Sequence, residues 1–219
     1  PMATNDHNVS GFVSLVFAAY EEGIKRIVYA SSSSVYGDEP NLPKVEDKIG
    51  NQLSPYAVSK YADELYAKVY GNLYGLEMVG FRYFNVFGPK QSPKGAYAAV
   101  IPLFVEGIIK ETPVYINGDG EQSRDFTYVE NAVQANVLGM TTDNQEALNQ
   151  VYNVAFGERY TVNELFFAIA KKLDSDMQPT YRDPRVGDIK HSLADISKVK
   201  KLLGYDPKFT LEKGLDESL

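Results

Sequence analysis

Tyr56 and Lys60 stand four residues apart, directly after a Ser54-Pro55 dipeptide, and their types and spacing predict proton transfer. Ser54 is a good helix N-cap and Pro55 suits the first helical position, so the phenol would lie in the first turn with the ammonium group on the same face. A phenol has an ordinary pKa of about 10, and its anion must be stabilised by about 3 pKa units, roughly 4 kcal/mol, before it accepts an alcohol proton at neutral pH. The lysine and the helix N-terminus would supply part of that stabilisation.

A Tyr-x-x-x-Lys spacing is common, and a surface pair on an amphipathic helix is the alternative when the spacing stands alone. The upstream residues favour the chemical interpretation, because a buried-looking strand over 26–31 runs into four serines at 31–34. Doubly wound sheets present reactive groups at the carboxyl ends of their strands, so a hydroxyl here could bridge a substrate oxygen and the phenol. An ordinary serine-rich turn is the alternative for this stretch.

The composition indicates a globular protein without metal or disulfides. The chain has 219 residues, of which 44% are hydrophobic, no cysteine and only two scattered histidines, so we expect no structural metal. A formal net charge of −7 and a sequence pI near 5.0 argue against a nucleic-acid surface. No apolar stretch approaches the ~20 residues that cross a bilayer, and no signal peptide is recognisable, so we expect no membrane contact and a cytoplasmic location.

Helical and strand-like segments alternate in the first half of the chain. We expect helices over 8–22 and 55–74, strands over 26–31 and 77–83, and a loop over 37–53. The strand cores lack polar alternation, as parallel strands do when helices cover both faces. The pattern predicts an α/β fold with a doubly wound parallel sheet.

The second half of the chain adds a predicted lobe. We expect a helix over 101–110, a strand over 113–117 before an Asp119-Gly120 turn, a sheet strand over 151–154, a helix to 172 that begins with a capping box at Thr161, and a short helix that ends at Gly204. The predicted fold is the C-terminal part of a Rossmann-like sheet over 1–91 and 126–156, plus a small α/β substrate-binding lobe over 92–125 and 157–219. No G-x-G-x-x-G turn occurs, so we expect roughly a hundred residues of a nucleotide-binding half to be missing upstream.

Five motifs occur in one order along the chain: ASSSSVYG at 30–37, YAVSK at 56–60, RYFNVFG at 82–88, GDGEQSRDF at 118–126 and RVGDIKHS at 185–192. Through these motifs the chain resembles the extended short-chain dehydrogenases of the NAD-dependent epimerase/dehydratase family. Within that family it resembles the UDP-N-acetylhexosamine 4-epimerases, which act on UDP-N-acetylglucosamine. The resemblance runs nearly end to end.

The resemblance implies a role for each matching residue. It implies catalysis by Tyr56, Lys60, Ser32 and Ser33. It implies contacts with an NAD cofactor from Asn8, Ala30, Ser31, Tyr56, Lys60, Tyr83, Phe84 and Val86. It implies contacts with a UDP-sugar from Ser32, Ser33, Asn85, Gln91, Ala99, Val100, Tyr115, Asn117, Arg124, Arg185, Asp188 and Ser192.

Some of these residue types have ordinary alternatives. Arg124 and Arg185 suit a diphosphate because a guanidinium binds phosphate through two hydrogen bonds, although either could instead form a surface ion pair. For Ala99 and Val100 the alternative is plain core packing. Strand aromatics such as Tyr83 are core residues by default.

The resemblance also separates possible reactions. Related dehydratases carry Asp and Glu at the two positions that are Ser33 and Ser34 here, and carbanion epimerases commonly use a cysteine, which this chain lacks. Reversible hydride transfer at C4 of the sugar, through a 4-keto intermediate, remains. Ser192 stands where glucose-restricted relatives have a bulky aromatic, so its small side chain favours N-acetylhexosamines; their uronic acids stay open as further substrates.

Other functions stay open from the sequence alone. They are a UDP-glucose 4-epimerase, another nucleotide-sugar dehydratase or reductase, and a non-catalytic UDP-sugar-binding fragment. Without a glycine-rich turn the chain lacks the helix N-terminus that holds a pyrophosphate, so we expect weak NAD binding and little activity from this chain alone. By resemblance, we expect the intact protein to be a homodimer.

Overall fold

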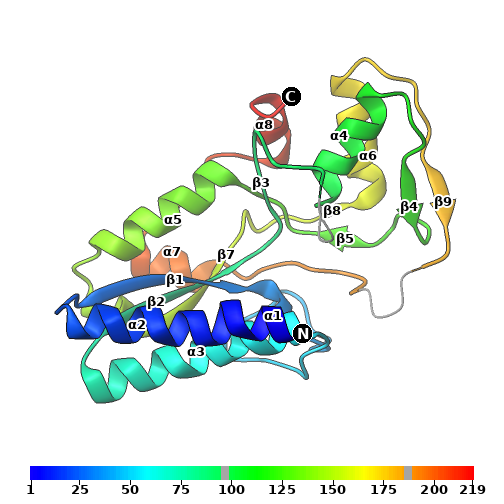
Figure 1. The fold of residues 1–219 in the computed structure, drawn as a ribbon. Helices are drawn as coiled ribbons and strands as arrows, with labels where there is room; N and C mark the ends of the chain where they lie inside the picture. Colours follow the sequence, from blue (N-terminus) through cyan, green and yellow to red (C-terminus); the bar gives the residue numbers. More distant parts are fainter. Residues whose placement is uncertain (95–98, 185–188) are drawn as a thin grey trace.

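A three-stranded parallel sheet forms the centre of the computed structural model, which describes residues 1–94, 99–184 and 189–219. Its strands are β1 (Arg26–Ser32), β2 (Glu77–Tyr83) and β7 (Gln150–Val154), in the order β1-β2-β7. All are parallel, with Arg26 opposite Glu77 and Val79 opposite Gln150. Helices cover both faces of the sheet (Figure 1), which confirms the predicted α/β fold.

Helices α2 (Gly11–Glu21) and α3 (Pro55–Tyr74) cover one face of the sheet. Val16 on α2 and Tyr70 on α3 pack there against Tyr29 and Met78 of the strands. Gly80 allows this packing, because a Cβ at that position would lie 2.5 Å from the Tyr29 ring.

The local signals for α3 work as expected. The hydroxyl of Ser54 accepts a hydrogen bond from the amide of Ala57 (3.1 Å), Pro55 occupies the first turn, and Gly75 ends the helix with φ +68°. The predicted bounds of α3 and β2 are therefore confirmed. The first helix begins earlier than predicted, as α1 (Met2–Asn5) followed by a π-helical segment η1 (Asp6–Ser10).

Helices α5 (Val129–Thr141) and α7 (Ser197–Leu203) cover the other face. Helix α5 was not predicted from the sequence. Its buried face consists of small residues such as Ala135 and Gly139, and Gly139 lies so close to Phe81 that a Cβ there would be 2.9 Å from the ring. Meanwhile Val133 is half exposed, so the usual apolar periodicity is missing.

The rest of the chain forms the lobe, which consists of short strands over two helices. Strand β4 (Tyr115–Asn117) pairs in parallel with β9 (Thr180–Arg182), and β5 (Ser123–Arg124) pairs antiparallel with β8 (Tyr160–Thr161). Helices α4 (Val100–Ile109) and α6 (Val162–Lys172) pack together, with the rings of Phe104 and Phe166 at 81° and 5.4 Å between centroids. Helix α8 (Leu211–Asp216) completes this core.

Short elements connect the sheet and the lobe. Strand β3 (Val86–Phe87) pairs with β6 (Thr127–Tyr128), while η2 (Ser33–Tyr36) and η3 (Gln145–Ala147) are single 3₁₀ turns. Residues 194–205 pack on the sheet core, although we expected them within the lobe, and Phe126 and Tyr128 pack on the lobe core. The exact domain boundaries stay a prediction.

Between residues 1 and 219, outside the gaps at 95–98 and 185–188, no helix is long and apolar enough to cross a membrane. Within the same ranges, no three His, Cys, Asp or Glu side chains gather in a way that could hold a metal ion.

Candidate active site

The predicted proton-transfer pair lies at the N-terminal end of α3, beside the carboxyl end of β1. Tyr56 is in the first helical turn and remains 42% exposed. The ammonium group of Lys60 donates to the backbone oxygen of Ala30 (2.9 Å) and pairs with a carboxylate oxygen of Asp63 (3.1 Å). Two of its three donors are thereby used, so the lysine is tied to the end of β1 with one N–H left for a ligand or the phenol.

The serines at the carboxyl end of β1 have different hydrogen-bond partners. The hydroxyl of Ser31 donates to Glu64 in the interior, so this side chain is committed to the protein, and a cofactor contact would involve its other atoms. Ser32 caps η2, and its oxygen accepts from the amide (3.2 Å) and the hydroxyl (3.0 Å) of Ser34. With both lone pairs used, the proton of Ser32 is available for donation.

Asn8 reaches the same region from η1. Its side-chain amide donates to the hydroxyl of Ser59 (2.9 Å), which in turn donates to the backbone oxygen of Tyr56 (2.8 Å). The π-helical turn that carries Asn8 is a type of distortion that is frequent at functional sites. The structure thus brings the predicted cofactor residue Asn8 to the first turn of α3.

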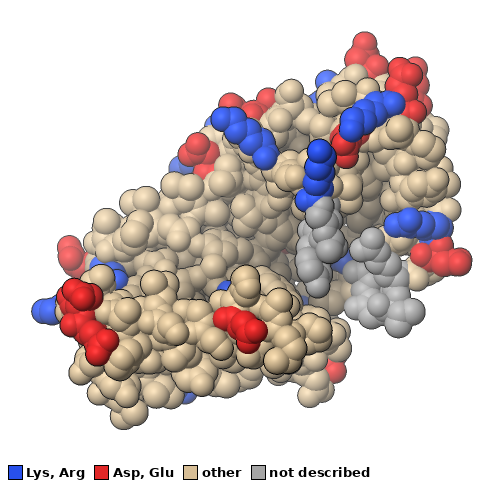
Figure 2. All heavy atoms as spheres, in the orientation of Figure 1, with Lys and Arg blue, Asp and Glu red and all other residues tan. Residues whose placement is uncertain are grey.

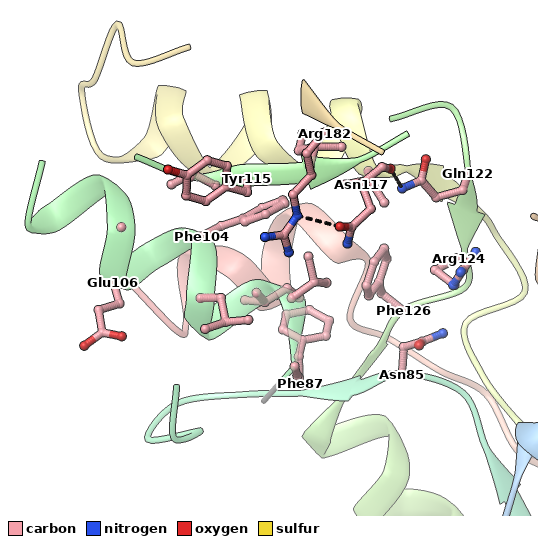
Figure 3. A pocket seen from close by; sticks show the side chains of 18 of the residues that line it. Asn85, Phe87, Phe104, Glu106, Tyr115, Asn117, Gln122, Arg124, Phe126 and Arg182 are labelled. Atoms are coloured by element: carbon pink, nitrogen blue, oxygen red, sulfur yellow. Dashed lines mark hydrogen bonds between the residues drawn. The ribbon is translucent and has the colours of Figure 1, made fainter. Parts of the chain in front are cut away.

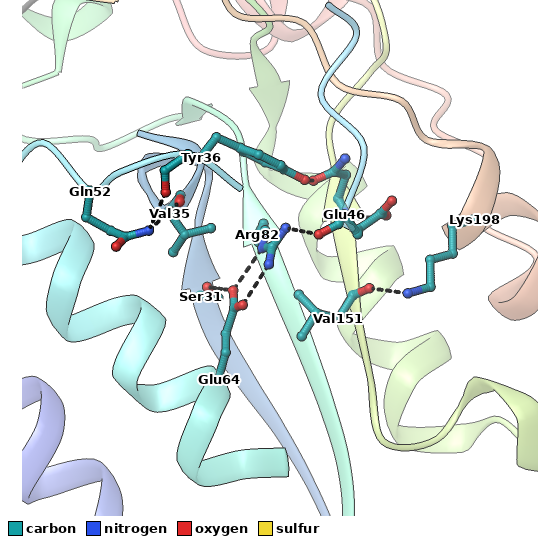
Figure 4. A network of polar contacts seen from close by, with 11 residues as sticks. Ser31, Val35, Tyr36, Glu46, Gln52, Glu64, Arg82, Val151 and Lys198 are labelled. Atoms are coloured by element: carbon teal, nitrogen blue, oxygen red, sulfur yellow. Dashed lines mark hydrogen bonds and ion pairs between the residues drawn. The ribbon is translucent and has the colours of Figure 1, made fainter. Parts of the chain in front are cut away.

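A buried ion pair joins α3 to the carboxyl end of β2 (Figure 4). Arg82 on β2 donates two hydrogen bonds to Glu64 on α3, at 2.9 and 2.7 Å, and a third to the backbone oxygen of Glu46 (2.9 Å). Burial alone would lower the pKa of Arg82, but its hydrogen bonds and charge interaction with Glu64 raise it. The guanidinium also lies over the ring of Tyr36, 4.8 Å from its centre.

The network continues to the third strand of the sheet. The hydroxyl of Tyr36 donates to Asn153 on β7 (2.6 Å), and burial raises the pKa of this tyrosine to about 12. The backbone amide of Asn153 donates to the side chain of Glu46 (2.9 Å). The positions around the Tyr56 helix are therefore fixed by hydrogen bonds that link all three strands.

A cavity of about 300 Å³ opens beside the N-terminus of α3. It is bounded by the helix start, by the turn after β1 and by the loops that follow β2 and precede α7. Its walls are formed by Ser33, Ser34, Tyr36, Gly37, Lys44, Leu53, Ser54, Ala57, Phe84, Asn85, Arg124, Ile189 and Ser192. Five of these residues were predicted from the sequence as site residues, namely Ser33, Phe84, Asn85, Arg124 and Ser192.

A larger cavity of about 550 Å³ lies within the lobe (Figure 3). It is mostly apolar and runs between α4 and strand β4. Seven predicted site residues line it, namely Asn85, Val86, Ala99, Val100, Tyr115, Asn117 and Arg124. Since Asn85 and Arg124 line both cavities, the two spaces meet at these residues.

Asn85 and Asp125 hold this junction together. Asn85 adopts a positive φ of 34°, and its side-chain amide donates to the backbone oxygen of Asp125 (2.8 Å). The buried carboxylate of Asp125 accepts from the amides of Phe156, Gly157 and Ala194 at 3.2–3.3 Å. Burial nevertheless raises the pKa of Asp125 to about 7, because removal from water outweighs these hydrogen bonds.

Several predicted site residues line neither of these two cavities, among them the catalytic candidates Tyr56, Lys60 and Ser32. The hydroxyl of Tyr83 accepts from Asn136 on α5 (2.7 Å), so its side chain lies on the face of the sheet away from α3. Gln91 lines neither of the two cavities and donates to the backbone oxygen of Val86 (3.2 Å). Val86 lines the larger cavity, although we expected it beside the cofactor. Arg185 and Asp188 lie outside the described residues.

Sequence reasoning missed Arg182, which extends into the larger cavity in Figure 3. Its Nε donates to the side-chain oxygen of Asn117 (2.6 Å), and its guanidinium lies 5.3 Å from the centre of the Tyr115 ring. Strand β9 is only three residues long and fully exposed, so it has no apolar pattern that a reading of the sequence could detect. The motif at 185–192 begins with Arg185, so the sequence favoured that arginine over Arg182.

The described residues fit the redox end of a dinucleotide. An exposed phenol, a lysine with one remaining donor and the end of β1 provide hydroxyl and amine groups suited to a ribose and a carboxamide. A glycine-rich turn that could hold the pyrophosphate is not found in the sequence. The site thus matches one half of a dinucleotide site and, in the two joined cavities, a site for an extended polar ligand.

This fold and site define a short-chain dehydrogenase that acts on nucleotide sugars. The comparison with known families agrees: residues 1–155 match the NAD dependent epimerase/dehydratase family, and the chain belongs to that family. Relatives and solved structures similar to it are UDP-sugar 4-epimerases, which are isomerases, and several of the solved structures contain NAD. The predicted family and NAD dependence are confirmed.

Three relatives show how far the similarity extends. The chain is 37% identical over 216 residues to a putative UDP-glucose 4-epimerase of Methanocaldococcus jannaschii, covering 98% of this chain and 68% of that protein. It is 35% identical to the UDP-glucose 4-epimerase of Mycolicibacterium smegmatis, covering 97% and 67%. The UDP-N-acetylglucosamine 4-epimerase of Methanobrevibacter ruminantium, solved with UDP-N-acetylmuramic acid, superimposes with a TM-score of 0.94 at 43% identity, covering 100% and 69%. The chain thus spans about two thirds of the length of these relatives.

Proposed function

We propose that the protein of which this chain is a part interconverts UDP-N-acetylhexosamines at C4, UDP-GlcNAc and UDP-GalNAc first, through a 4-keto sugar. The observation that carries the proposal is the pair of cavities that share Asn85 and Arg124. One is lined by Ser54 and Ala57 at the start of the helix that carries Tyr56, and the other lies inside the lobe. A nucleotide sugar has a matching shape, with a sugar and a nucleoside on either side of a diphosphate. The sugar would then lie in the cavity beside the helix of the phenol.

The chain's own residues perform the proton chemistry in this proposal. Tyr56 accepts the proton of the C4 hydroxyl, and Lys60 stabilises the phenolate that receives it. Ser32 donates its available proton to the same substrate oxygen, while Arg124 holds the diphosphate at the junction. Bound NAD supplies a reversible hydride acceptor. After the 4-keto sugar has turned over, the hydride held by NAD would be returned to the other face of C4, and Tyr56 returns the proton to the C4 oxygen, which yields the epimer.

The choice of N-acetylhexosamine rests on Ser192. This residue lines the smaller cavity, and its backbone amide is fixed by a hydrogen bond to the backbone oxygen of Ser123 (2.9 Å). A small side chain at a fixed wall leaves space for a 2-acetamido group. The substrate named for the M. ruminantium enzyme supports this choice, whereas relatives named for UDP-glucose and UDP-glucuronate keep those sugars as alternatives.

Replacing Tyr56 by Phe in the intact protein tests the chemistry. We expect turnover of UDP-GlcNAc to fall by about 10²- to 10⁴-fold, the usual contribution of a general acid-base group, with UDP affinity retained. Tyr66→Phe is the matched control, since Tyr66 lies on the same helix with the same 42% exposure. Equal turnover by the two variants would contradict the proposal. So would a product that has lost its 6-hydroxyl, because that is a dehydratase product.

Replacing Ser192 by Tyr tests the sugar preference. We expect kcat/KM to fall at least tenfold for UDP-GlcNAc while it stays nearly unchanged for UDP-glucose, because one added ring fills the space of the acetamido group. Ser192→Ala serves as the control and should leave both values within about twofold. If both sugars lose activity equally in the Tyr variant, Ser192 does not select the substrate.

A non-catalytic UDP-sugar-binding role for the chain by itself is the second candidate. It is favoured by the location of the larger cavity, which lies within the described residues, whereas no glycine-rich turn is found in the sequence. Calorimetry on residues 1–219 should then show binding of UDP and little binding of NAD. Tight NAD binding by the chain alone would count against this candidate.

We also propose that the intact protein is a homodimer that pairs through α2 and α3. Four apolar residues of α3 form one exposed stripe, namely Val58, Leu65, Val69 and Leu73, and Leu15 on α2 is equally exposed. Figure 2 shows few charged side chains over these helices. Light scattering should give a dimer mass that Leu65→Glu converts to a monomer mass, and an unchanged mass would argue against this interface.

A further inference from the structure

Arg182 extends into the larger cavity at a place that no motif marked. The residue stands on β9 directly opposite Asn117 of β4, and the backbone amide of Gly118 donates to its backbone oxygen (2.7 Å). Its position on the wall of the cavity is therefore set by strand pairing. The side chain is exposed, although its backbone is fixed in this way.

Two contacts hold the guanidinium in a defined plane. Nε donates to the side-chain oxygen of Asn117 (2.6 Å), and the central carbon of the guanidinium lies over the Tyr115 ring, 5.3 Å from the ring centre (Figure 3). The backbone oxygen of Asn117 accepts from Gln122 (2.8 Å), which steadies this partner in turn. A planar cation with one face covered by an aromatic ring leaves its opposite face for a second flat group.

The connection between the cavities decides which part of a ligand reaches Arg182. A diphosphate links the sugar to the nucleoside, so it must pass the place where the cavities meet, at Asn85 and Arg124. Arg182 lines the larger cavity and does not line the smaller one. It therefore belongs to the nucleoside end of the ligand.

The surroundings of Arg182 favour a base over a second phosphate. Most of the cavity wall is apolar, with Phe104, Val114 and Phe126 among its residues. Glu106, the acidic residue of the wall, pairs with Lys110 and so leaves the arginine to a ligand. Away from Arg124 at the junction, the apolar chamber with the oriented guanidinium of Arg182 suits a neutral aromatic ring, because stacking needs a flat surface and little charge.

We propose that Arg182 is a specificity residue that stacks its guanidinium on the nucleobase, so that the base lies against a layer formed by Arg182 and Tyr115. The inference rests on the proposed function, since it assumes that a nucleotide occupies the larger cavity. It adds a base-binding residue to a site whose other predicted contacts came from sequence motifs.

The test measures binding of uridine, UMP and UDP to the 219-residue chain by NMR titration or calorimetry. We expect Arg182→Ala and Arg182→Lys each to weaken all three ligands by a similar factor of about 10, because lysine keeps the charge and loses the plane. The loss should not depend on salt between 50 and 300 mM, on the order of the screening range. Lys201→Ala, at an exposed position on α7, is the control and should change nothing.

Each other outcome overturns the inference in a distinct way. A loss that is absent for uridine, grows with each phosphate and shrinks with salt would make Arg182 a phosphate residue. Full affinity in Arg182→Lys with loss in Arg182→Ala would show that charge, not planarity, matters. Unchanged binding in both variants would remove Arg182 from the site while leaving the proposed function intact. Failure of the unmodified chain to bind either uridine or UDP would refute the proposed function, and this inference with it.

Discussion

The sheet unit, made of β1, β2 and β7 with helices α2, α3, α5 and α7, and the lobe hold their parts of the site by different means. In the sheet unit, Tyr56 and Lys60 lie on a 20-residue helix that is joined to β2 by a buried ion pair. In the lobe, Tyr115 and Arg182 stand on strands of three residues that rest on an apolar core. The residues proposed for proton transfer thus stand on long regular elements, and those proposed for ligand contacts stand on short pairings between distant segments.

The two units should therefore differ in which substitutions lower their folding stability. Breaking one partner of a buried ion pair leaves an uncompensated charge in the interior, which is strongly destabilising. Short surface strands over an apolar core do not depend on one buried charge pair, and substitution of their exposed side chains has little effect on folding stability. Chemistry and stability are therefore coupled in the sheet unit and largely separate in the lobe.

Replacing Glu64 by Gln should have the largest effect on stability. The change leaves the buried guanidinium of Arg82 without its charged partner, so we expect a loss of about 3–5 kcal/mol in the free energy of unfolding. Urea denaturation followed by circular dichroism measures it. Glu77→Gln is the control: Glu77 pairs with Arg26 on the same sheet, but both side chains are partly exposed, so about 1 kcal/mol or less is expected. Similar losses of stability in both variants would contradict the expectation that the sheet unit depends on its buried ion pair.

Asp125 lies between the two units and should make their union depend on pH. Its folded pKa of about 7 exceeds the ordinary value of 3.8, so the folded state keeps a proton that the unfolded state releases. The stabilisation is fully present below about pH 4 and is lost as the pH rises through 7, with a slope of up to about 1.4 kcal/mol per pH unit. Between pH 5 and 8 the stability of Asp125→Asn should therefore rise relative to that of the unmodified chain. Parallel stability curves would contradict this.

A matched pair of N-cap deletions gives the smallest effect and the sharpest contrast. Ser54 caps α3 and Thr161 caps α6, and the side-chain oxygen of each accepts a hydrogen bond from a backbone amide at 3.0–3.1 Å. Replacing either by Ala should cost about 1 kcal/mol of stability. In the intact protein only Ser54→Ala should also lower kcat, because Tyr56 lies in the turn that this cap fixes. A comparable fall in kcat for Thr161→Ala would show that the lobe also controls the chemistry.

Much of the sheet unit could be predicted because its signals are local. Ser54, Pro55 and Gly75 mark the ends of α3 within the segment itself, and β2 has the continuous apolar pattern of a covered strand. Helix α5 was missed because its buried face is made of Ala and Gly, which fit closely against Phe81 and give no apolar period. Arg82 and Glu64 are 18 residues apart and lie on two different elements, so their pairing could not be inferred from either element alone.

Several predicted site residues that line a cavity stand where a motif coincides with the end of a regular element. Ser33, Phe84 and Asn85 follow strand ends directly, and all three line the smaller cavity. Arg182 was missed because its function depends on the pairing of β9 with β4 across 65 residues of chain. Non-local pairing of short exposed strands leaves no periodic trace in a sequence, so only coordinates reveal it.

The meeting of both cavities at Asn85 and Arg124 has a mechanical consequence. A nucleotide sugar that fills both spaces would contact the sheet unit and the lobe at the same time and so link the two. Its binding free energy then resists their separation, and at 100 times the dissociation constant it adds about 2.7 kcal/mol of resistance to unfolding. Bound substrate would in this way stabilise the folded protein. Its lifetime against proteolysis should therefore lengthen when the cell contains more substrate.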